Sequence, residues 1–291
     1  MTADASVPRP RLPREPLYQT PAVAWPTLAV FVFGLLLWVG AIVVAEQGLI
    51  SPAVALFLQT VAAFAEFTVM HEGVHHSLLR GHPKLNAVIS GIAAVFLGVL
   101  ASRAAFRYLH FKHHRLTNES GDPDLWSGKG SAWRKPLQWL TADIGYAVAT
   151  IKDWSKIPAA GRREMVLTLT ATFGVLAVLV SLGYGKDVLL YWLLPARLAI
   201  LWLAFAFNYL PHHPHKIEQR HNPYAASNVR EGGEPIMRLL CLYQNYHLIH
   251  HLFPSVPFYR YARIWERNRS AYIELGAQVR AWHGMEPKHR D

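Results

Sequence analysis

Hydrophobic residues are concentrated in four long runs, separated by segments that are rich in polar and basic residues. A helix that crosses a lipid bilayer needs about 20 mostly apolar residues, and each run approaches or exceeds that length. The four runs are Ala24–Ala45, Val54–Met70, Met165–Leu182 and Val188–Leu210. They predict an all-α integral membrane protein with four transmembrane helices. The short gaps within the first pair and within the second pair predict two helical hairpins.

A fifth apolar run, Leu85–Ala101, is interrupted by Asn86 and Ser90. We expect this segment to form a re-entrant or interfacial helix that does not cross the membrane. Glu66 and Arg197 fall inside predicted spans, where a charged side chain is costly and often functional. Glu66 is expected either to reach toward the membrane surface or to accept a hydrogen bond from a nearby histidine. The sequence suggests no partner for Arg197.

The distribution of Lys and Arg orients the predicted hairpins. Residues 46–51, between the first two runs, contain neither Lys nor Arg, whereas residues 103–163 and 212–291 are rich in both. Cytoplasmic segments carry an excess of these residues, so both termini and the middle segment are expected to be cytoplasmic. We treat residues 1–291 as a single domain, with a polar N-terminal tail (1–22) and a C-terminal cytoplasmic tail (263–291).

The overall composition supports a membrane location and argues against nucleic-acid binding. Hydrophobic residues make up 52% of the chain and charged residues only 16%, whereas soluble domains carry about 25% charged residues. The net charge of +10 comes from residues scattered along membrane-flanking segments, which suits anionic headgroups or an acidic protein partner. Cys241 is the only cysteine, so there is no disulfide framework.

Three histidine clusters with similar spacing indicate a metal site. On a helix, positions i, i+3 and i+4 share one face, so each cluster is expected to aim two or three imidazoles at one point. All three clusters fall on the predicted cytoplasmic side, provided that the fifth run does not cross, and would form a histidine-rich cap. The clusters are His71-x-x-x-His75-His76, His110-x-x-His113-His114 and His247-x-x-His250-His251.

The number of histidines favours two metal ions over one. Imidazole suits iron, zinc and copper, but a zinc site uses only three or four protein ligands. Carboxylates are scarce near the clusters, with Glu72, Asp122 and Asp124 the closest, so a carboxylate-rich site is not expected. Two metals beside a lipid phase suggest dioxygen chemistry on an apolar substrate. A membrane zinc hydrolase and a metal transporter remain as remote alternatives.

The triple histidine pattern resembles the membrane fatty-acid desaturase and hydroxylase superfamily. The resemblance covers about residues 71–262. Within the superfamily, the segments 208–212 (Asn-Tyr-Leu-Pro-His) and 244–259, together with 113–124, look most like the desaturase-type β-carotene hydroxylases.

The resemblance implies a set of metal ligands. Asn208 is implied as a further ligand that acts through water, and no catalytic residue beyond the ligands is implied. The implied histidine ligands are His71, His75, His76, His110, His113, His114, His212, His247, His250 and His251.

The resemblance also implies the chemistry. It implies a non-heme di-iron oxidoreductase with two Fe ions that uses O2 as co-substrate and attacks unactivated C–H bonds of a membrane lipid or carotenoid. Ring hydroxylation of a β-carotene-type substrate is the favoured reaction, and desaturation of a fatty acyl lipid is the alternative. Electrons are expected from an external donor of ferredoxin type or similar.

Overall fold

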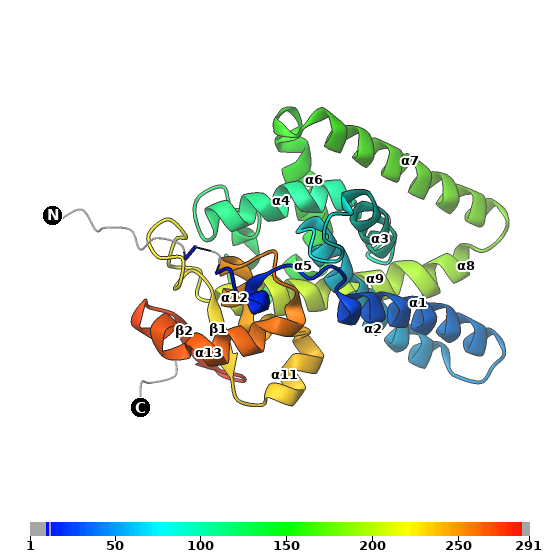
Figure 1. Ribbon diagram of the computed structural model, residues 1–291. Coiled ribbons are helices and arrows are strands. Elements are labelled where there is room, and N and C mark those ends of the chain that lie inside the picture. The colour runs from blue at the N-terminus through cyan, green and yellow to red at the C-terminus, as the bar shows by residue number, and fades with distance from the viewer. Residues whose placement is uncertain (1–9, 12, 287–291) are drawn as a thin grey trace. The chain divides into compact units, whose positions relative to one another are not determined.

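A computed structural model describes residues 10–11 and 13–286 and is mostly helical (Figure 1). Four helical segments are long and apolar enough to cross a membrane, which confirms the four predicted spans. Three are single helices, and the fourth is a continuous segment that includes two π-helical stretches. They are α1 (Trp25–Glu46), α2 (Pro52–Val74), α7 (Ala159–Ser181) and Gly185–His212, which comprises α8 (Gly185–Val188), η5 (Leu189–Leu193), α9 (Leu194–Leu203), η6 (Ala204–Tyr209) and α10 (Leu210–His212).

Local sequence signals explain where these helices begin and end. Ser51 accepts a hydrogen bond from the backbone N–H of Val54, and Pro52 occupies the first position of α2, where a missing N–H costs nothing. α1 and α7 are each followed by a glycine in the left-handed region, Gly48 (φ 72°) and Gly183 (φ 92°). Glycine adopts this conformation without steric penalty and so ends both helices.

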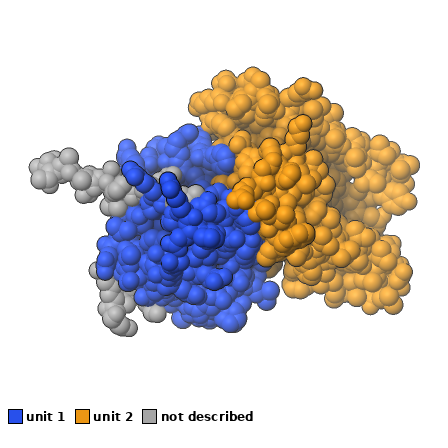
Figure 2. Space-filling view, viewed as in Figure 1, with its two compact units in different colours: residues 1–21, 110–135, 204–291 blue, residues 22–109, 136–203 orange. Residues whose placement is uncertain are grey.

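The described chain forms two compact units (Figure 2). Unit 1 comprises residues up to 21, 110–135 and 204 onward, and unit 2 comprises residues 22–109 and 136–203. Each unit is described by itself below. The description of residues 1–291 as a single domain stays a prediction.

Unit 2 is built around α2, most of whose side chains are buried. Small residues let the helices approach closely, and Ala62 and Ala63 of α2 pack with Trp38 of α1 and Phe96. α7, by contrast, leaves nearly all of its apolar side chains exposed, as expected for a helix that faces lipid. The other helical elements of this part of the chain are α3 (Pro83–Val95), the start of α4 (Arg103–Leu116), α5 (Lys135–Leu140), α6 (Ala142–Lys152) and η4 (Trp154–Lys156).

α3 corresponds to the fifth apolar run. It has 13 residues, which span roughly 20 Å at 1.5 Å per residue and fall short of the ~30 Å hydrocarbon layer. The side chain of Asn86 explains the early start of this helix, because it bonds the backbone carbonyl of Leu79 in the preceding turn. The expectation of a helix that does not cross is therefore consistent with its length.

The structure corrects the expectation for Glu66. Its side chain is fully buried in α2, and neither carboxyl oxygen has a hydrogen-bond partner among the described residues. Glu66 faces Gly34 of α1, where an added methyl group would lie only 2.3 Å from a carboxyl oxygen. It thus neither reaches the surface nor bonds a histidine, because the close approach of α1 encloses it.

Arg197 has a partner that the sequence did not reveal. Its guanidinium group forms a two-pronged ion pair with Asp143 of α6, at 2.5 and 3.0 Å, and also donates to the carbonyl of Leu140. The two residues are distant in sequence, so no local spacing rule pairs them.

Unit 1 contains the end of the last span and the remaining elements. A parallel pair of short strands sets Val229 opposite Val279. The N-terminal segment packs on η8 and α13: Arg260 of η8 donates to the carbonyl of Gln19, and Asn268 of α13 donates to the hydroxyl of Tyr18. The elements are η1 (Pro16–Tyr18), the end of α4, η2 (Leu125–Gly128), η3 (Ala132–Arg134), β1 (Asn228–Glu231), α11 (Glu234–Cys241), η7 (Gln244–Tyr246), α12 (His247–Leu252), η8 (Phe258–Arg260), α13 (Tyr261–Glu274) and β2 (Gln278–Ala281).

Candidate metal centre

Unit 1 brings together seven of the ten histidines that the resemblance implied as ligands. They come from the end of α4, from the last residue of α10 and from α12, and none is more than 8% exposed. Full burial of so many imidazoles is unusual, because histidine is only intermediate in its tendency to be buried. The seven are His110, His113, His114, His212, His247, His250 and His251.

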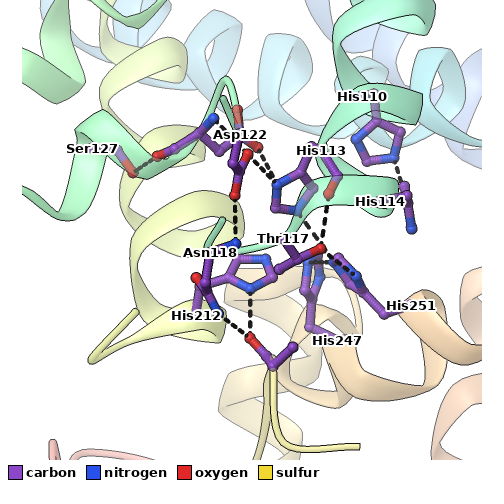
Figure 3. Close-up of polar contacts among 12 residues, drawn as sticks. His110, His113, His114, Thr117, Asn118, Asp122, Ser127, His212, His247 and His251 are labelled. Carbon is purple, nitrogen blue, oxygen red and sulfur yellow. Dashed lines mark hydrogen bonds and ion pairs between the residues drawn. The ribbon is translucent and has the colours of Figure 1, made fainter. Parts of the chain in front are cut away.

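Four of these residues form the first group, which we call the four-histidine cluster: His113, His212, His247 and His251. One ring nitrogen from each lies within 4.8 Å of the others. The Nε2 atom of His251 is 3.1 Å from Nε2 of His247 and 3.3 Å from Nε2 of His113. Figure 3 shows His113, His247 and His251 converging, with His212 beside them.

The other three form the second group, the three-histidine cluster: His110, His114 and His250. The Nε2 atom of His114 lies 3.0 Å from that of His110 and 2.8 Å from that of His250. The Nε2 atoms of His250 and His110 are 3.4 Å apart. Unit 1 therefore contains two distinct points of imidazole convergence.

In α4 and in α12, two imidazoles of the sequence cluster converge on one point, and the third belongs to the other group. In α4, His110 and His114 serve one cluster and His113 serves the other. In α12, His247 and His251 share a cluster and His250 belongs to the second. Residues four apart lie on one face of a helix, whereas adjacent residues differ by about 100° in direction. The second and third sequence clusters are thus each divided between two groups.

The other ring nitrogen, Nδ1, is held by an acceptor in three rings of the four-histidine cluster. His113 bonds Asp122 at 2.9 Å, His247 bonds the side-chain oxygen of Gln244 at 2.6 Å, and His212 bonds the carbonyl of Ala226 at 3.2 Å. An acceptor at Nδ1 holds a ring proton there, so Nε2 is the nitrogen that faces the cluster.

In two of the remaining rings, a hydroxyl group occupies the corresponding position. Tyr261 lies 3.1 Å from Nδ1 of His250, and Thr117 lies 3.4 Å from Nδ1 of His251. Such partners orient metal-binding imidazoles and are conserved features of metal sites in general.

Charge acts in opposite directions within the four-histidine cluster. Burial disfavours the charged form of His113, but Asp122 and Asp124 outweigh burial and raise its pKa to about 9. Burial, together with the neighbouring histidines, lowers the pKa of His251 well below its usual value. His251 is therefore neutral and able to donate a lone pair, and the carboxylates near His113 favour positive charge at this point.

The two groups have the chemistry of a metal site. Several Nε2 lone pairs face one another at about 3 Å, an arrangement that is repulsive unless a cation or a proton lies between them. The Nε2 atom of His212 is buried and has no hydrogen-bond partner among the described residues, which suits a nitrogen available to bind a metal ion. These histidines can hold a metal ion.

The first sequence cluster lies in unit 2. His71 is on the last turn of α2, which continues beyond the predicted end at Met70, and its ring centroid is 5.2 Å from that of His75. His76 is exposed and adopts a left-handed backbone conformation (φ 57°). Burial, then His71, His76 and Arg107, lower the pKa of His75 well below its usual value.

Among the residues near the last span, only His212 joins a cluster, as expected. His213 and His215 are partly buried outside it, and Asn208 is partly buried in η6. The ligand roles of Asn208 and of all ten histidines stay predictions.

Sequence reasoning missed the residues that orient the rings. Asp122 was noted only as a nearby carboxylate, although it follows His113 closely in an Asp-Pro-Asp motif. Gln244, three residues before His247, was another available signal. Tyr261 and Thr117 carried none, because nothing in their local sequence indicates contact with α12.

The fold and the site define a multi-pass membrane protein with a histidine-rich centre suited to metal. The chain belongs to the fatty acid desaturase family, whose sequence profile matches residues 47–282. A beta-carotene ketolase of Paracoccus sp. (strain PC1) is 30% identical over 200 residues, which cover 68% of this chain and 72% of the ketolase.

Two further relatives extend the comparison. A second beta-carotene ketolase, of Paracoccus sp. (strain N81106 / MBIC 01143), is also 30% identical, over 197 residues, with 67% and 71% of the two chains covered. A chloroplastic omega-3 fatty acid desaturase of Ricinus communis is 25% identical over 235 residues, covering 70% of this chain and 50% of its own. Membership of this family makes the protein a membrane oxidoreductase.

Proposed function

We propose that this protein is an O2-dependent carotenoid hydroxylase that acts on the ring of a β-carotene-type substrate. The observation that carries this proposal is the pair of buried histidine clusters whose Nε2 atoms converge while acceptors or hydroxyl groups lie against Nδ1. That geometry supports two metal positions. Two positions are what the family resemblance implies for dioxygen chemistry on an unactivated C–H bond.

The proposed ligands follow the clusters. The four-histidine cluster would hold one iron ion, and the three-histidine cluster would contribute to holding the second. Bound iron would supply dioxygen activation and hydrogen abstraction from a C–H bond. His71, His75 and His76 stay in the proposed set on the family resemblance alone.

The chain's own residues would fix the geometry of this chemistry. Asp122, Gln244 and the Ala226 carbonyl hold protons on Nδ1 and so present Nε2 toward the metal position. Precise positioning of a bound substrate relative to the reactive centre accounts for much of an enzyme's rate enhancement.

Similarity to the relatives favours a carotenoid over a fatty acyl chain as the substrate. Two relatives named as beta-carotene ketolases are more similar to this chain than the relative named as an omega-3 desaturase. Desaturation of a fatty acyl lipid remains the second candidate, because the chain also matches that desaturase over 70% of its length.

The proposed reaction needs electrons from outside the chain. With a single cysteine, the sequence cannot supply a cysteine-bound iron–sulfur cluster, and we propose an external donor of ferredoxin type. Unit 1 exposes the basic residues Arg115, Lys216 and Arg263, which suit an acidic protein. Turnover should slow as salt is raised, and salt-insensitive turnover would contradict this docking mode.

The test combines product and metal analysis. The chain is expressed with a ferredoxin system in a host that makes β-carotene, and pigments and acyl lipids are analysed by mass spectrometry. We expect a carotenoid that has gained a hydroxyl group, and about two iron ions in the purified protein.

Other products would change the assignment. A keto product would make the chain a ketolase, and unchanged carotenoid with newly unsaturated acyl chains would make it a desaturase. The variants His113→Ala and His250→Ala should lose metal and activity while still inserting into the membrane. The matched control is His221→Ala, an exposed histidine paired with Glu218.

A further inference from the structure

α11 presents an apolar face that no described residue covers. Ile236 is 50% exposed, Leu239 74% and Leu240 43%, although all three are large hydrophobic side chains. They occupy positions i, i+3 and i+4 and therefore form one stripe on the helix. The opposite side of α11 buries Met237 and Cys241 in unit 1.

Arg238, in the middle of α11, is bonded to other elements of unit 1. Arg238 bonds the hydroxyl of Tyr246 at 3.2 Å and Glu266 of α13 at 3.3 Å. These bonds fix the rotation of α11 about its axis. The exposed stripe is thus a stable feature of the fold.

Both ends of α11 are turns in the left-handed backbone region. Gly232 (φ 87°) and Gly233 (φ 62°) precede it, and Leu242 (φ 42°) and Tyr243 (φ 66°) follow it. Two successive residues other than glycine rarely adopt this conformation, which costs free energy unless the surroundings require it. The turns direct α11 away from the strand before it and the histidine helix after it.

The strand before α11 is attached to the end of a membrane span. In β1, Asn228 donates to the carbonyl of Leu210 at 2.9 Å, and Arg230 donates to the same carbonyl at 3.4 Å. Leu210 lies in the last three residues of the fourth span, and only Gly232 and Gly233 separate β1 from α11. α11 therefore starts near the level at which that span leaves the bilayer.

We propose that α11 lies in the bilayer interface, with Ile236, Leu239 and Leu240 inserted among the lipid chains. An amphipathic helix with one apolar stripe typically binds in this way. The three side chains expose on the order of 300 Å², well below the ~800 Å² that each partner contributes to a stable protein interface. A lipid surface is therefore the occupant that fits both the size and the position of the stripe.

Insertion of α11 into the interface would affect the position of the histidines of α12. α11 is followed by Leu242 and Tyr243, then by Gln244, which holds His247. Anchoring α11 in the interface would set the depth of α12 relative to the lipid from which an apolar substrate enters.

The test measures depth with a spin label in liposomes. Leu239→Cys is labelled with a nitroxide, and its collision rates with O2, which concentrates in lipid, and with water-soluble nickel chelate are compared. Cys241 is buried, and labelling of the unaltered protein gives the background. The references are Ser270→Cys on the exposed face of α13 and Val178→Cys on the exposed face of α7.

We expect the O2-to-nickel ratio at position 239 to be several-fold higher than at 270 and to approach that at 178. A ratio equal to that at 270 would overturn the proposal. So would spin–spin broadening between labelled copies, which would show that a second copy covers the stripe. Ile236→Cys repeats the measurement if Leu239→Cys does not fold. No turnover is measured, so failure here is distinct from failure of the proposed hydroxylase.

Discussion

The carboxylate of Asp122 and the imidazole of His113 form a buried hydrogen bond of 2.9 Å. Asp122 is itself held in place, because its oxygens accept the backbone N–H groups of Asn118 at 2.8 Å and Asp124 at 2.9 Å. The carboxylate is thus fixed in position to accept the proton that His113 carries on Nδ1. This pair makes the affinity of the four-histidine cluster for metal depend on pH.

In the metal-free protein, Asp122 and Asp124 overcome the effect of burial and raise the pKa of His113 to about 9. Below that pH His113 carries an extra proton, which a metal ion must displace. Apparent affinity should therefore rise about tenfold per pH unit between pH 7 and 9 and then level off. Titration with Zn²⁺ or Co²⁺ at several pH values measures this slope.

Asp122→Asn should lower metal affinity about 10- to 100-fold and make the affinity level off closer to neutral pH. The control is Glu218→Gln, which alters a carboxylate beside the exposed His221 and should change neither quantity. An unchanged pH profile in Asp122→Asn would contradict the role of this carboxylate.

Tyr261→Phe tests the orientation of the three-histidine cluster. The variant removes the hydroxyl group that lies 3.1 Å from Nδ1 of His250 while keeping the buried ring. Because His250 would lose its orienting partner, we expect activity to fall by about tenfold with little loss of stability. Activity and thermal unfolding are measured together, with Tyr259→Phe as the control. Full activity in Tyr261→Phe would show that packing alone orients the ring.

The ion pair of Arg197 and Asp143 predicts an asymmetric response to mutation. Asp143→Ala leaves the guanidinium unpaired inside a span, and we expect the free energy of unfolding to fall by about 2 kcal/mol. This is below the cost for fully buried pairs because the Arg197 side chain is 35% exposed. The double variant Arg197→Met/Asp143→Met should recover much of the loss. Equal destabilisation in both variants would argue against the pair.

Replacing Glu66 with an apolar residue is expected to stabilise the protein. The two buried oxygens of Glu66 have no hydrogen-bond partner in the described part of the chain, so replacing them with an apolar group of similar shape removes a desolvation cost. Glu66→Met should raise stability by about 1 to 3 kcal/mol in a denaturation assay. Gly34→Ala, in contrast, should destabilise, because the new methyl group meets the Glu66 carboxyl. A less stable Glu66→Met protein would indicate a polar ligand at this position.

The proposed topology can be tested by cysteine labelling in intact cells. We expect Lys84→Cys and Ser120→Cys to react only from the cytoplasmic side and Gln47→Cys only from the opposite side. All three positions are exposed, and the native Cys241 is buried. Labelling of positions 84 and 120 from opposite sides would mean that the segment between them crosses the membrane.

The four spans could be predicted from sequence because their signal is local. Hydrophobic length alone identified them, and the structure shifted the first span by one residue and lengthened the other three, most clearly at His71, which lies within α2. The histidines were also identifiable by spacing, because i and i+4 positions share a helical face. The division of the second and third sequence clusters between two groups could not be predicted, since it depends on which helix faces each side of α4.

Contacts between segments that are distant in sequence could not be predicted for the same reason. Nothing local links Arg197 to Asp143 or His250 to Tyr261, and no local pattern showed that Gly34 would enclose Glu66. These pairs depend on the tertiary packing of helices.

The neighbouring histidines of α4 and of α12 have a consequence for assembly. His113 and His114 are joined by one peptide bond yet belong to different clusters, and so do His250 and His251. The backbone of these two short helices therefore fixes the spacing between the two clusters. Within these helices, filling one cluster should leave the other preformed, so the two ions can be loaded one after the other in either order.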